Sequence, residues 1–325
     1  MNIFLTGGAG YIGSATAEAL VKAGHSVTVY DSLVTGHREA VPTGAEFIHA
    51  SLDDHQVLAQ ALNGKKYDAI MHFAAFIEAG ESMKDPGRFF RNNFGNSLQL
   101  METAVQAGVR KFVFSSTAAV YQSSEEPLTE DSPIGPTNVY GHTKLMTEQV
   151  LEWYRSIFGM HYAVLRYFNA CGALPGRGEA HQPESHLIPR VLQIALGQAE
   201  SATIFGTDYP TPDGTCIRDY IHIADLVSAH ILALNALETR DQMTFNVGSG
   251  NGFSVREVIE TARKVTGHAI PVIEAPRRPG DSARLVASPK RIIHELGWQP
   301  QNTNMHDILS SAWEWHKSHP HGYGK

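Results

Sequence analysis

The stretch Thr6–Gly13, with the sequence TGGAGYIG, decides the fold of this chain. It follows a short apolar run, Ile3–Leu5, which predicts a buried β-strand. It precedes Ser14–Ala23, which predicts a helix. Glycine recurs at every third position of the stretch, at Gly7, Gly10 and Gly13. A strand, a glycine turn and a helix in this order open a unit that binds phosphates, although glycines alone also occur in ordinary loops.

Each glycine of the pattern has its own physical role. The first lets the strand turn, the second lets backbone approach a pyrophosphate, and the third lets the helix pack against the strand. The helix N-terminus then offers unpaired N–H groups to the phosphates. A second predicted strand, Ser26–Tyr30, ends at Asp31. A carboxylate there can bind a ribose diol and would repel a 2′-phosphate, so the unit predicts an NAD site rather than an NADP site.

Composition and charge exclude several classes of protein. The 325 residues suffice for one large or two modest domains, and 42% of them are hydrophobic. The net charge of −7 argues against a nucleic-acid partner. The two cysteines, Cys171 and Cys216, form no CxxC motif, which favours a reducing compartment. The chain has no basic leader and no apolar run of roughly 18–20 residues, so we expect no membrane contact and a cytoplasmic location.

The order of the predicted elements points to an α/β fold. Strand and helix patterns alternate through the first half, with long predicted helices at Pro86–Ala107 and Gly141–Phe158. This alternation predicts a Rossmann-type doubly wound parallel sheet in residues 1–168. Residues 169–325 are richer in loops and predict a smaller C-terminal α/β substrate-binding lobe. Part of this second half is expected to return to the first domain.

A YxxxK pair, Tyr140 and Lys144, is the candidate for acid–base chemistry. Positions i and i+4 share one face of a helix, so the ammonium would lie beside the phenol. A neighbouring positive charge favours phenolate and lowers the pKa of the tyrosine from about 10, and a positively charged nicotinamide would lower it further. Thr117 follows the β-rich run Phe112–Ser116, and its hydroxyl could hold the same substrate oxygen.

Longer motifs extend the argument to the whole chain. The chain resembles the extended short-chain dehydrogenase/reductase family, in particular its members that epimerise UDP-hexoses at carbon 4. The resemblance rests on TGGAGYIG, HFAAFIEAGES, SSTAAVYQ, YGHTK, LRYFNACGA, IFGTDYPTPDGTCIRDYIHIADL and APRRPGDSARLVA. It implies tightly bound NAD, transient oxidation at C4, rotation of a 4-keto sugar and return of the hydride. It also implies a homodimer formed through the two long helices.

The resemblance assigns roles residue by residue. Thr117, Tyr140 and Lys144 would be catalytic. The cofactor would be held by Gly7, Gly10, Tyr11, Ile12, Gly13, Asp31, Leu52, Phe73, Ala74, Ala75, Asn92, Ser115, Tyr140, Lys144 and Tyr167. The UDP-sugar would be held by Thr117, Tyr140, Asn169, His186, Leu187, Phe205, Arg218, Arg278, Asp281 and Leu285. An arginine pair suits a diphosphate because guanidinium presents fork-shaped donors.

The chain departs from the family pattern at three places. Ser51-Leu52 replaces an Asp-Ile pair beside the adenine, Ile77 replaces a lysine near the nicotinamide ribose, and His186 replaces an asparagine. Leu285 stands where a tyrosine excludes N-acetyl sugars. Leucine is smaller than tyrosine, so we expect main activity on UDP-glucose and UDP-galactose and weaker activity on the N-acetylated pair.

Two other functions fit the same fold. A nucleotide-sugar 4,6-dehydratase or UDP-glucuronate decarboxylase would carry acidic groups after the catalytic threonine, whereas this chain has Ala118 and Ala119. A cofactor-sensing scaffold would have lost the catalytic residues, which are intact here. Histidines gather at two places, His181 and His186 near Glu184, and the tail around His316, His319 and His321. Hydride chemistry needs no metal, so we expect none.

Overall fold

The computed structural model describes residues 1–182, 184–278 and 281–324. The chain divides into two compact units, and each unit is assembled from separate segments. Unit 1 comprises Met1–Gln122, Pro133–Arg166 and Val227–Phe245. Unit 2 comprises Ser123–Ser132, Tyr167–Leu226 and Asn246–Lys325. The chain thus enters the second unit three times, at Ser123, Tyr167 and Asn246, and passes back into the first at Pro133 and Val227.

A seven-stranded sheet with the order β10-β6-β5-β4-β1-β2-β3 forms the centre of unit 1. Its strands are β1 (Asn2–Thr6), β2 (Ser26–Asp31), β3 (Glu46–His49), β4 (Ala69–His72), β5 (Lys111–Thr117), β6 (His161–Tyr167) and β10 (Gln242–Val247). The five strands from β3 to β5 pair in parallel. Thr6 pairs with both Tyr30 and His72, so β1, β2 and β4 end at the same edge. This confirms the predicted Rossmann-type sheet, whose ligands bind at the carboxyl ends of the strands.

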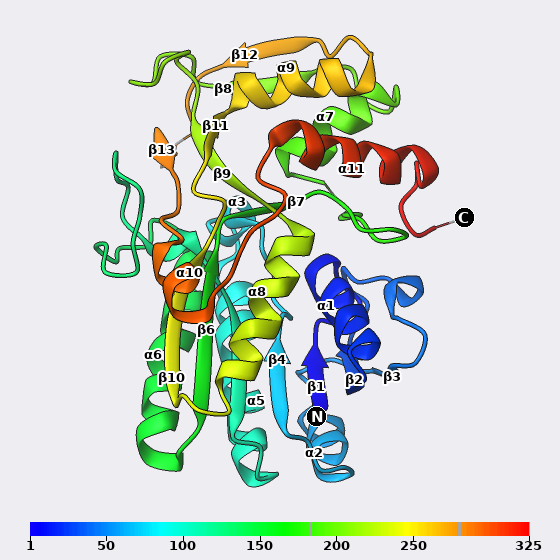
Figure 1. Ribbon diagram of the computed structural model, residues 1–325, viewed down its shortest axis with the longest axis vertical. Coiled ribbons are helices and arrows are strands. Elements are labelled where there is room, and N and C mark those ends of the chain that lie inside the picture. The colour runs from blue at the N-terminus through cyan, green and yellow to red at the C-terminus, as the bar shows by residue number, and fades with distance from the viewer. Residues whose placement is uncertain (183, 279–280, 325) are drawn as a thin grey trace. The chain divides into compact units, whose positions relative to one another are not determined.

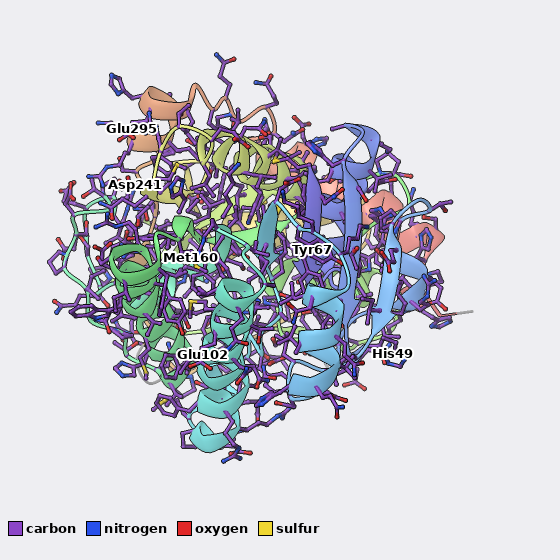
Figure 2. All side chains as sticks on the ribbon, turned by 90° about the horizontal axis from the view of Figure 1, so that it is seen from below. His49, Tyr67, Glu102, Met160, Asp241 and Glu295 are labelled. Carbon is purple, nitrogen blue, oxygen red and sulfur yellow. The ribbon has the colours of Figure 1, made fainter. Side chains whose placement is uncertain are left out.

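Helices cover both faces of this sheet. They are α1 (Tyr11–Lys22), α2 (His55–Asn63), α3 (Ala79–Ser82), α4 (Pro86–Phe89), α5 (Asn96–Gln106), α6 (Val139–Phe158) and α8 (Ile223–Ala236). Figure 1 shows α1 and α8 on the near face of the strands, with α5 and α6 behind them. The core between these layers is apolar, and it includes Tyr67 and Met160, both labelled in Figure 2.

The sequence predicts one continuous helix at Pro86–Ala107, but the structure divides this segment into three helical pieces. The segment is α4, then a π-helical turn at Phe90–Gly95, then α5. In the π-helical turn the Asn93 side chain accepts a hydrogen bond from the Phe76 backbone N–H at 2.8 Å and donates to the Phe76 carbonyl oxygen at 2.9 Å. A π-helical turn inserts one residue into a helix and re-aims its side chains, and such turns are frequent at functional sites.

Unit 2 contains two small sheets and a group of helices. Its strands are β7 (Asn169–Cys171), β8 (Ala202–Phe205), β9 (Ile217–His222), β11 (Gly252–Ser254), β12 (Val272–Ala275) and β13 (Arg284–Leu285). Its helices are α7 (Leu187–Ala195), α9 (Val255–Thr266), α10 (Lys290–Leu296) and α11 (Met305–Ser318). Strand β9 pairs with β7, β11 and β13, and β8 pairs with β12. Helix α9 packs against α7 and α11, and these three helices enclose the apolar core of this unit.

None of the helices that the structure describes is both long enough and apolar enough to span a bilayer.

Candidate active site

In the glycine loop between β1 and α1, protein packing demands glycine at two of the three positions of the motif. Gly7 has φ +74°, and a Cβ there would lie 2.5 Å from the backbone nitrogen of Ala74. A Cβ at Gly13 would lie 2.1 Å from the carbonyl oxygen of Gly7. At Gly10 the nearest protein atom to a Cβ would be 3.3 Å away, so protein packing alone does not demand glycine there. Gly10 precedes the first turn of α1 and carries no capping side chain, which leaves the N–H groups open to a pyrophosphate.

Asp31 lies at the end of β2 and is 8% exposed. Its carboxylate accepts hydrogen bonds from the backbone N–H of Ala9 at 2.9 Å and of Leu33 at 2.8 Å. Burial raises the pKa of Asp31, while these two backbone hydrogen bonds lower it. A carboxylate has about four acceptor sites, so two remain for a ribose diol. The glycine loop and Asp31 therefore fit the dinucleotide that the sequence predicts.

The other predicted cofactor residues stand at the ends of the same strands. Phe73, Ala74 and Ala75 follow β4, Ser115 lies in β5, and Tyr167 is the last residue of β6. Tyr11 and Ile12 open α1. Asn92 lies in the π-helical turn and donates to the Asn93 side chain at 3.0 Å. Leu52 packs into the apolar core of unit 1. Their contacts with NAD stay predictions.

The structure brings together the three predicted catalytic residues. Thr117 ends β5, whereas Tyr140 and Lys144 lie in α6, whose first turn is capped by Asn138. The helix therefore begins at Val139, two residues before the predicted start at Gly141. The Thr117 side chain lies near enough to the Tyr140 phenol to lower its pKa by hydrogen bonding. The buried Lys144 donates to the Ser115 carbonyl oxygen at 2.8 Å, and its Nζ lies 6.0 Å from the centre of the Tyr140 ring.

The charge state of this group differs from the sequence-based expectation. Burial raises the pKa of Tyr140 to about 12, while the hydrogen bond with Thr117 opposes the shift and the Glu78 carboxylate adds to it. Burial also lowers the pKa of Lys144 to about 7, although the negative charge of Glu148 acts to raise it. In the chain alone burial outweighs any effect of Lys144 on the phenol, so the lowering of the Tyr140 pKa by Lys144 stays a prediction. A positively charged ligand beside the phenol would lower its pKa further.

A buried ion pair beside the catalytic group was not predicted. Glu148, one turn after Lys144, accepts from Arg166 at 2.6 Å and from Ser116. Arg166 also donates to the hydroxyl of Tyr121 at 2.9 Å. These contacts tie α6 to β5 and β6. The i+4 spacing from Lys144 to Glu148 was visible in the sequence, but its buried partner in β6 was not.

In unit 2 the predicted UDP-sugar residues form two groups, one in and beside β9 with Arg218, Asp281 and Leu285, and one at β8 with Phe205 and Arg278. The Arg218 guanidinium donates to the Ser282 carbonyl oxygen at 2.8 Å and lies 3.4 Å from the Asp281 carboxylate. Leu285 pairs with Arg218 across β13 and β9. The Arg278 guanidinium lies over the Phe205 ring, 3.8 Å from its centre. Pro279 and Gly280, in the same motif, lie outside the described residues.

Three further predicted residues lie at other positions of unit 2. Asn169 lies in β7 and donates to the Asp219 carbonyl oxygen at 2.8 Å. Leu187 begins α7, and His186 is the residue before it. The Nδ1 atom of His186 lies 2.8 Å from Glu179, which the sequence did not single out, and 3.0 Å from Glu184. The contacts of these residues with a UDP-sugar stay predictions.

A family comparison agrees with this geometry. The model of the NAD dependent epimerase/dehydratase family matches residues 3–248. The chain therefore belongs to the NAD dependent epimerase/dehydratase family.

Individual relatives are similar over their whole length. The UDP-glucose 4-epimerase of Halalkalibacterium halodurans is 49% identical over an alignment of 327 positions, and this alignment covers 99% of this chain and 98% of the relative. A crystal structure of a UDP-glucose 4-epimerase is 47% identical with a TM-score of 0.97, and the match covers both chains completely. The Bifidobacterium longum UDP-glucose 4-epimerase, solved with NAD⁺ and UDP, is 32% identical with a TM-score of 0.94 over 99% of this chain and 100% of that chain. These findings show UDP-glucose 4-epimerase activity with NAD as cofactor.

Proposed function

We propose that Tyr140, Thr117 and Lys144 carry the epimerase chemistry, and that the residues around β9 hold the UDP part of the substrate. The observation that carries the proposal is the placement of Thr117 beside Tyr140, together with a lysine that is buried and held by the Ser115 carbonyl. Two hydroxyls placed side by side can converge on one substrate oxygen, which is the arrangement that proton transfer at a sugar hydroxyl requires.

The proton moves through Tyr140. NAD⁺, held by the glycine loop and Asp31, would accept the hydride from C4 and supply it again for the other face of the sugar. Tyr140 takes the proton from the O4 hydroxyl as the C4–H bond breaks, and it gives the proton back when that bond re-forms. Thr117 holds O4 during both transfers. Lys144, when protonated, and the positive cofactor together offset the burial that keeps the phenol protonated in the chain alone.

The uridine diphosphate is proposed to bind around β9. Phe205 offers an aromatic face for the uracil, while Arg218 and Arg278 offer fork-shaped donors to the diphosphate. Asp281 accepts from the ribose, and Asn169 with His186 and Leu187 completes the set. Of this set, Arg278 and Asp281 are exposed and most of the others are half-buried, so they can grip the nucleotide and leave the sugar free to turn.

Ala118 and Ala119 favour epimerisation over elimination or decarboxylation. They form a short turn after Thr117, in which the Thr117 hydroxyl accepts a hydrogen bond from the Ala119 backbone N–H at 3.1 Å. Elimination of water or loss of carboxylate needs an acid or base beside the oxidised carbon. Methyl side chains at these two positions supply neither.

We also propose that the chain forms a homodimer through α6. Trp153 is 66% exposed and Ile157 is 64% exposed, and the two lie four residues apart on one face of this helix. Large apolar side chains grouped in this way are typical of an interface. The two free cysteines, both buried, are compatible with the proposed cytoplasmic location.

The test of the proposed chemistry is the fate of the hydrogen on C4. The enzyme is incubated with UDP-galactose in deuterated water, and the UDP-glucose formed is analysed by NMR. If the hydride leaves and returns inside the site, C4 keeps its protium through many turnovers. Deuterium at C4 would instead show removal of a C4 proton to solvent and would refute the proposed roles.

A further inference from the structure

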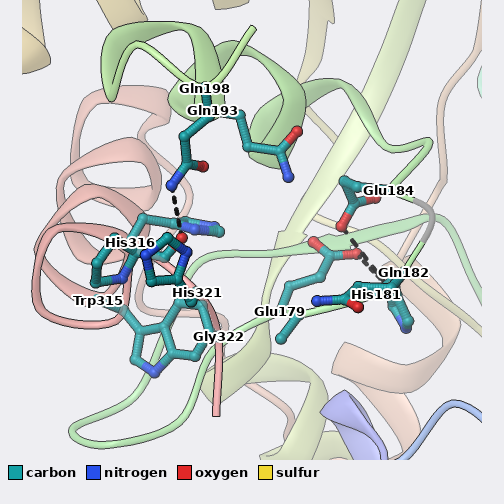
Figure 3. A pocket seen from close by; sticks show the side chains of 12 residues that line it. Glu179, His181, Gln182, Glu184, Gln193, Gln198, Trp315, His316, His321 and Gly322 are labelled. Carbon is teal, nitrogen blue, oxygen red and sulfur yellow. Dashed lines mark hydrogen bonds and ion pairs between the residues drawn. The ribbon is translucent and has the colours of Figure 1, made fainter. Parts of the chain in front are cut away.

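A cluster of four side chains in unit 2 lies beside the proposed UDP-recognition group and shares only His186 with it. It comprises Glu179, His181, Glu184 and His186, each of which directs one potential ligand atom toward the others. All four atoms lie within 4.8 Å of one another. Figure 3 shows the carboxylates of Glu179 and Glu184 and the ring of His181 directed toward one another at one end of a pocket.

The four ligand atoms lie close together, and small movements of their side chains would bring them to the spacing of a tetrahedral ligand shell. The Nδ1 atom of His186 lies 2.8 Å from Glu179 Oε1 and 3.0 Å from Glu184 Oε1. The Nδ1 atom of His181 lies 3.1 Å from Glu179 Oε1 and 3.9 Å from Glu184 Oε2. Ligands about 2.0–2.1 Å from a tetrahedral zinc ion are separated by about 3.3–3.4 Å. Three of the four measured separations, at 2.8–3.1 Å, are shorter than that value, and the fourth, at 3.9 Å, is longer.

Each imidazole contacts a carboxylate at hydrogen-bond distance, and the two negative charges of the cluster are balanced either by protons or by a cation. Each Nδ1 atom carries at most one hydrogen, so His186 cannot donate fully to both carboxylates that it contacts. Both carboxylates are buried, with side chains 6% exposed at Glu179 and 3% exposed at Glu184. Protonation of both imidazoles would balance the two negative charges, but it would place two positive rings 5.4 Å apart, centre to centre. One divalent cation between neutral imidazoles balances the same charge without that repulsion.

The ligands are also held in position by their surroundings. Glu184 accepts hydrogen bonds from the backbone N–H groups of Ser185 and His186, each at 2.8 Å, which fixes its carboxylate. His186 immediately precedes α7. A pocket of about 250 Å³, lined by Glu179, His181, Glu184, Trp315, His316 and His321 among others, gives an ion a path to the cluster. A fixed shell and an entry path are what a metal site requires.

We propose that Glu179, His181, Glu184 and His186 bind one zinc ion that ties the segment after β7 to the start of α7. Two imidazole nitrogens and two carboxylate oxygens form a closed set of four ligands, and zinc accepts both types in tetrahedral geometry. The role is structural, because a set of four protein ligands leaves no open position for a substrate. The epimerase chemistry does not pass through this ion.

The first test is the metal content of the protein, expressed without a histidine tag and dialysed against metal-free buffer. We expect about one zinc per chain by mass spectrometry, and a fall in melting temperature after chelation that equimolar zinc chloride reverses. Replacing zinc with cobalt(II) should give the intense visible bands of tetrahedral coordination. The proposal is overturned if the protein holds no zinc after incubation with equimolar zinc chloride, or if its cobalt form has the weak bands of octahedral coordination.

Variants then assign the ligands. His181→Asn should lower the affinity for zinc by more than the roughly 10–100-fold that a lost outer-shell contact costs. The matched control is His321→Asn, because His321 lines the same pocket outside the cluster and should keep wild-type affinity. Retained NAD content and the far-UV spectrum verify that each variant is folded. Equal zinc affinity in the two variants would refute the assignment.

Discussion

The catalytic group of unit 1 and the UDP-recognition group of unit 2 are built in different ways. Lys144 and Thr117 are buried, and their contacts run to the backbone of β5 and to a tyrosine on a separate element. Arg278 and Asp281 are exposed, and their contacts are a stacked ring and an ion pair at 3.4 Å. This difference indicates that atoms taking part in the reaction are held in a fixed geometry, whereas the nucleotide is held by adaptable contacts.

The largest effect is expected from Tyr140→Phe. Loss of a positioned acid–base group typically costs about 10²–10⁴-fold in rate, so kcat should fall by that order. Binding of UDP, measured by calorimetry, should stay near wild type, because the recognition group lies in unit 2. Tyr154→Phe is the matched control, since Tyr154 is a buried tyrosine of the same helix. Near-normal turnover in Tyr140→Phe would contradict the role of Tyr140 as the acid–base group.

Glu148→Ala tests how the fixed geometry is maintained. It leaves the buried Arg166 without its carboxylate partner, and breaking such a pair costs about 3–5 kcal/mol in the free energy of unfolding. Urea denaturation measures this loss. Glu152→Ala, one turn further along α6, removes the more exposed partner of Arg155 and should cost about 0–1 kcal/mol. A similar loss of unfolding free energy in the two variants would mean that the Glu148–Arg166 pair does not stabilise the position of α6.

Lys144→Met tests the charge balance through the pH dependence of stability. Burial lowers the pKa of Lys144 from 10.5 to about 7 in the folded chain, so the unfolded chain binds the proton more tightly. Between those two values the cofactor-free protein should gain stability as the pH rises, and Lys144→Met should lose this gain. Urea unfolding at both ends of the range measures the slope. An unchanged slope in Lys144→Met would exclude a depressed pKa, and Lys22→Met serves as an exposed control.

The smallest effect is expected from Leu285→Tyr. A larger side chain beside the sugar should disfavour UDP-N-acetylglucosamine relative to UDP-glucose by about 1–3 kcal/mol in kcat/KM. Rates on both substrates give this ratio. A ratio that stays at the wild-type value would show that Leu285 does not limit the size of the sugar, and that the predicted alignment of this segment is at fault.

Local patterns predicted much of unit 1 from the sequence. The glycine spacing, Asp31 at the end of β2 and the helix bearing Tyr140 and Lys144 depend on neighbours along the chain. The structure confirms their placement, although α6 begins earlier because Asn138 caps it. Such features are visible because periodicity and turn chemistry act over a few residues.

Features that depend on distant partners were missed. The Glu148–Arg166 pair joins residues 18 positions apart on different elements. The raised pKa of Tyr140 comes mainly from burial, which no spacing in the sequence measures. The cluster of Glu179 and His186 was passed over because its residues stand in a polar loop, where charge usually means exposure. The structure shows that both of its carboxylates are buried.

The central claim is that this chain epimerises UDP-hexoses with a cofactor that it retains through the whole cycle. The most direct measurement follows UDP-galactose with the purified protein and no added nucleotide cofactor. We expect conversion to a mixture with UDP-glucose, with NAD rather than NADP released on denaturation. A 4-keto-6-deoxy product, or no conversion by protein that carries one NAD per chain, would contradict it.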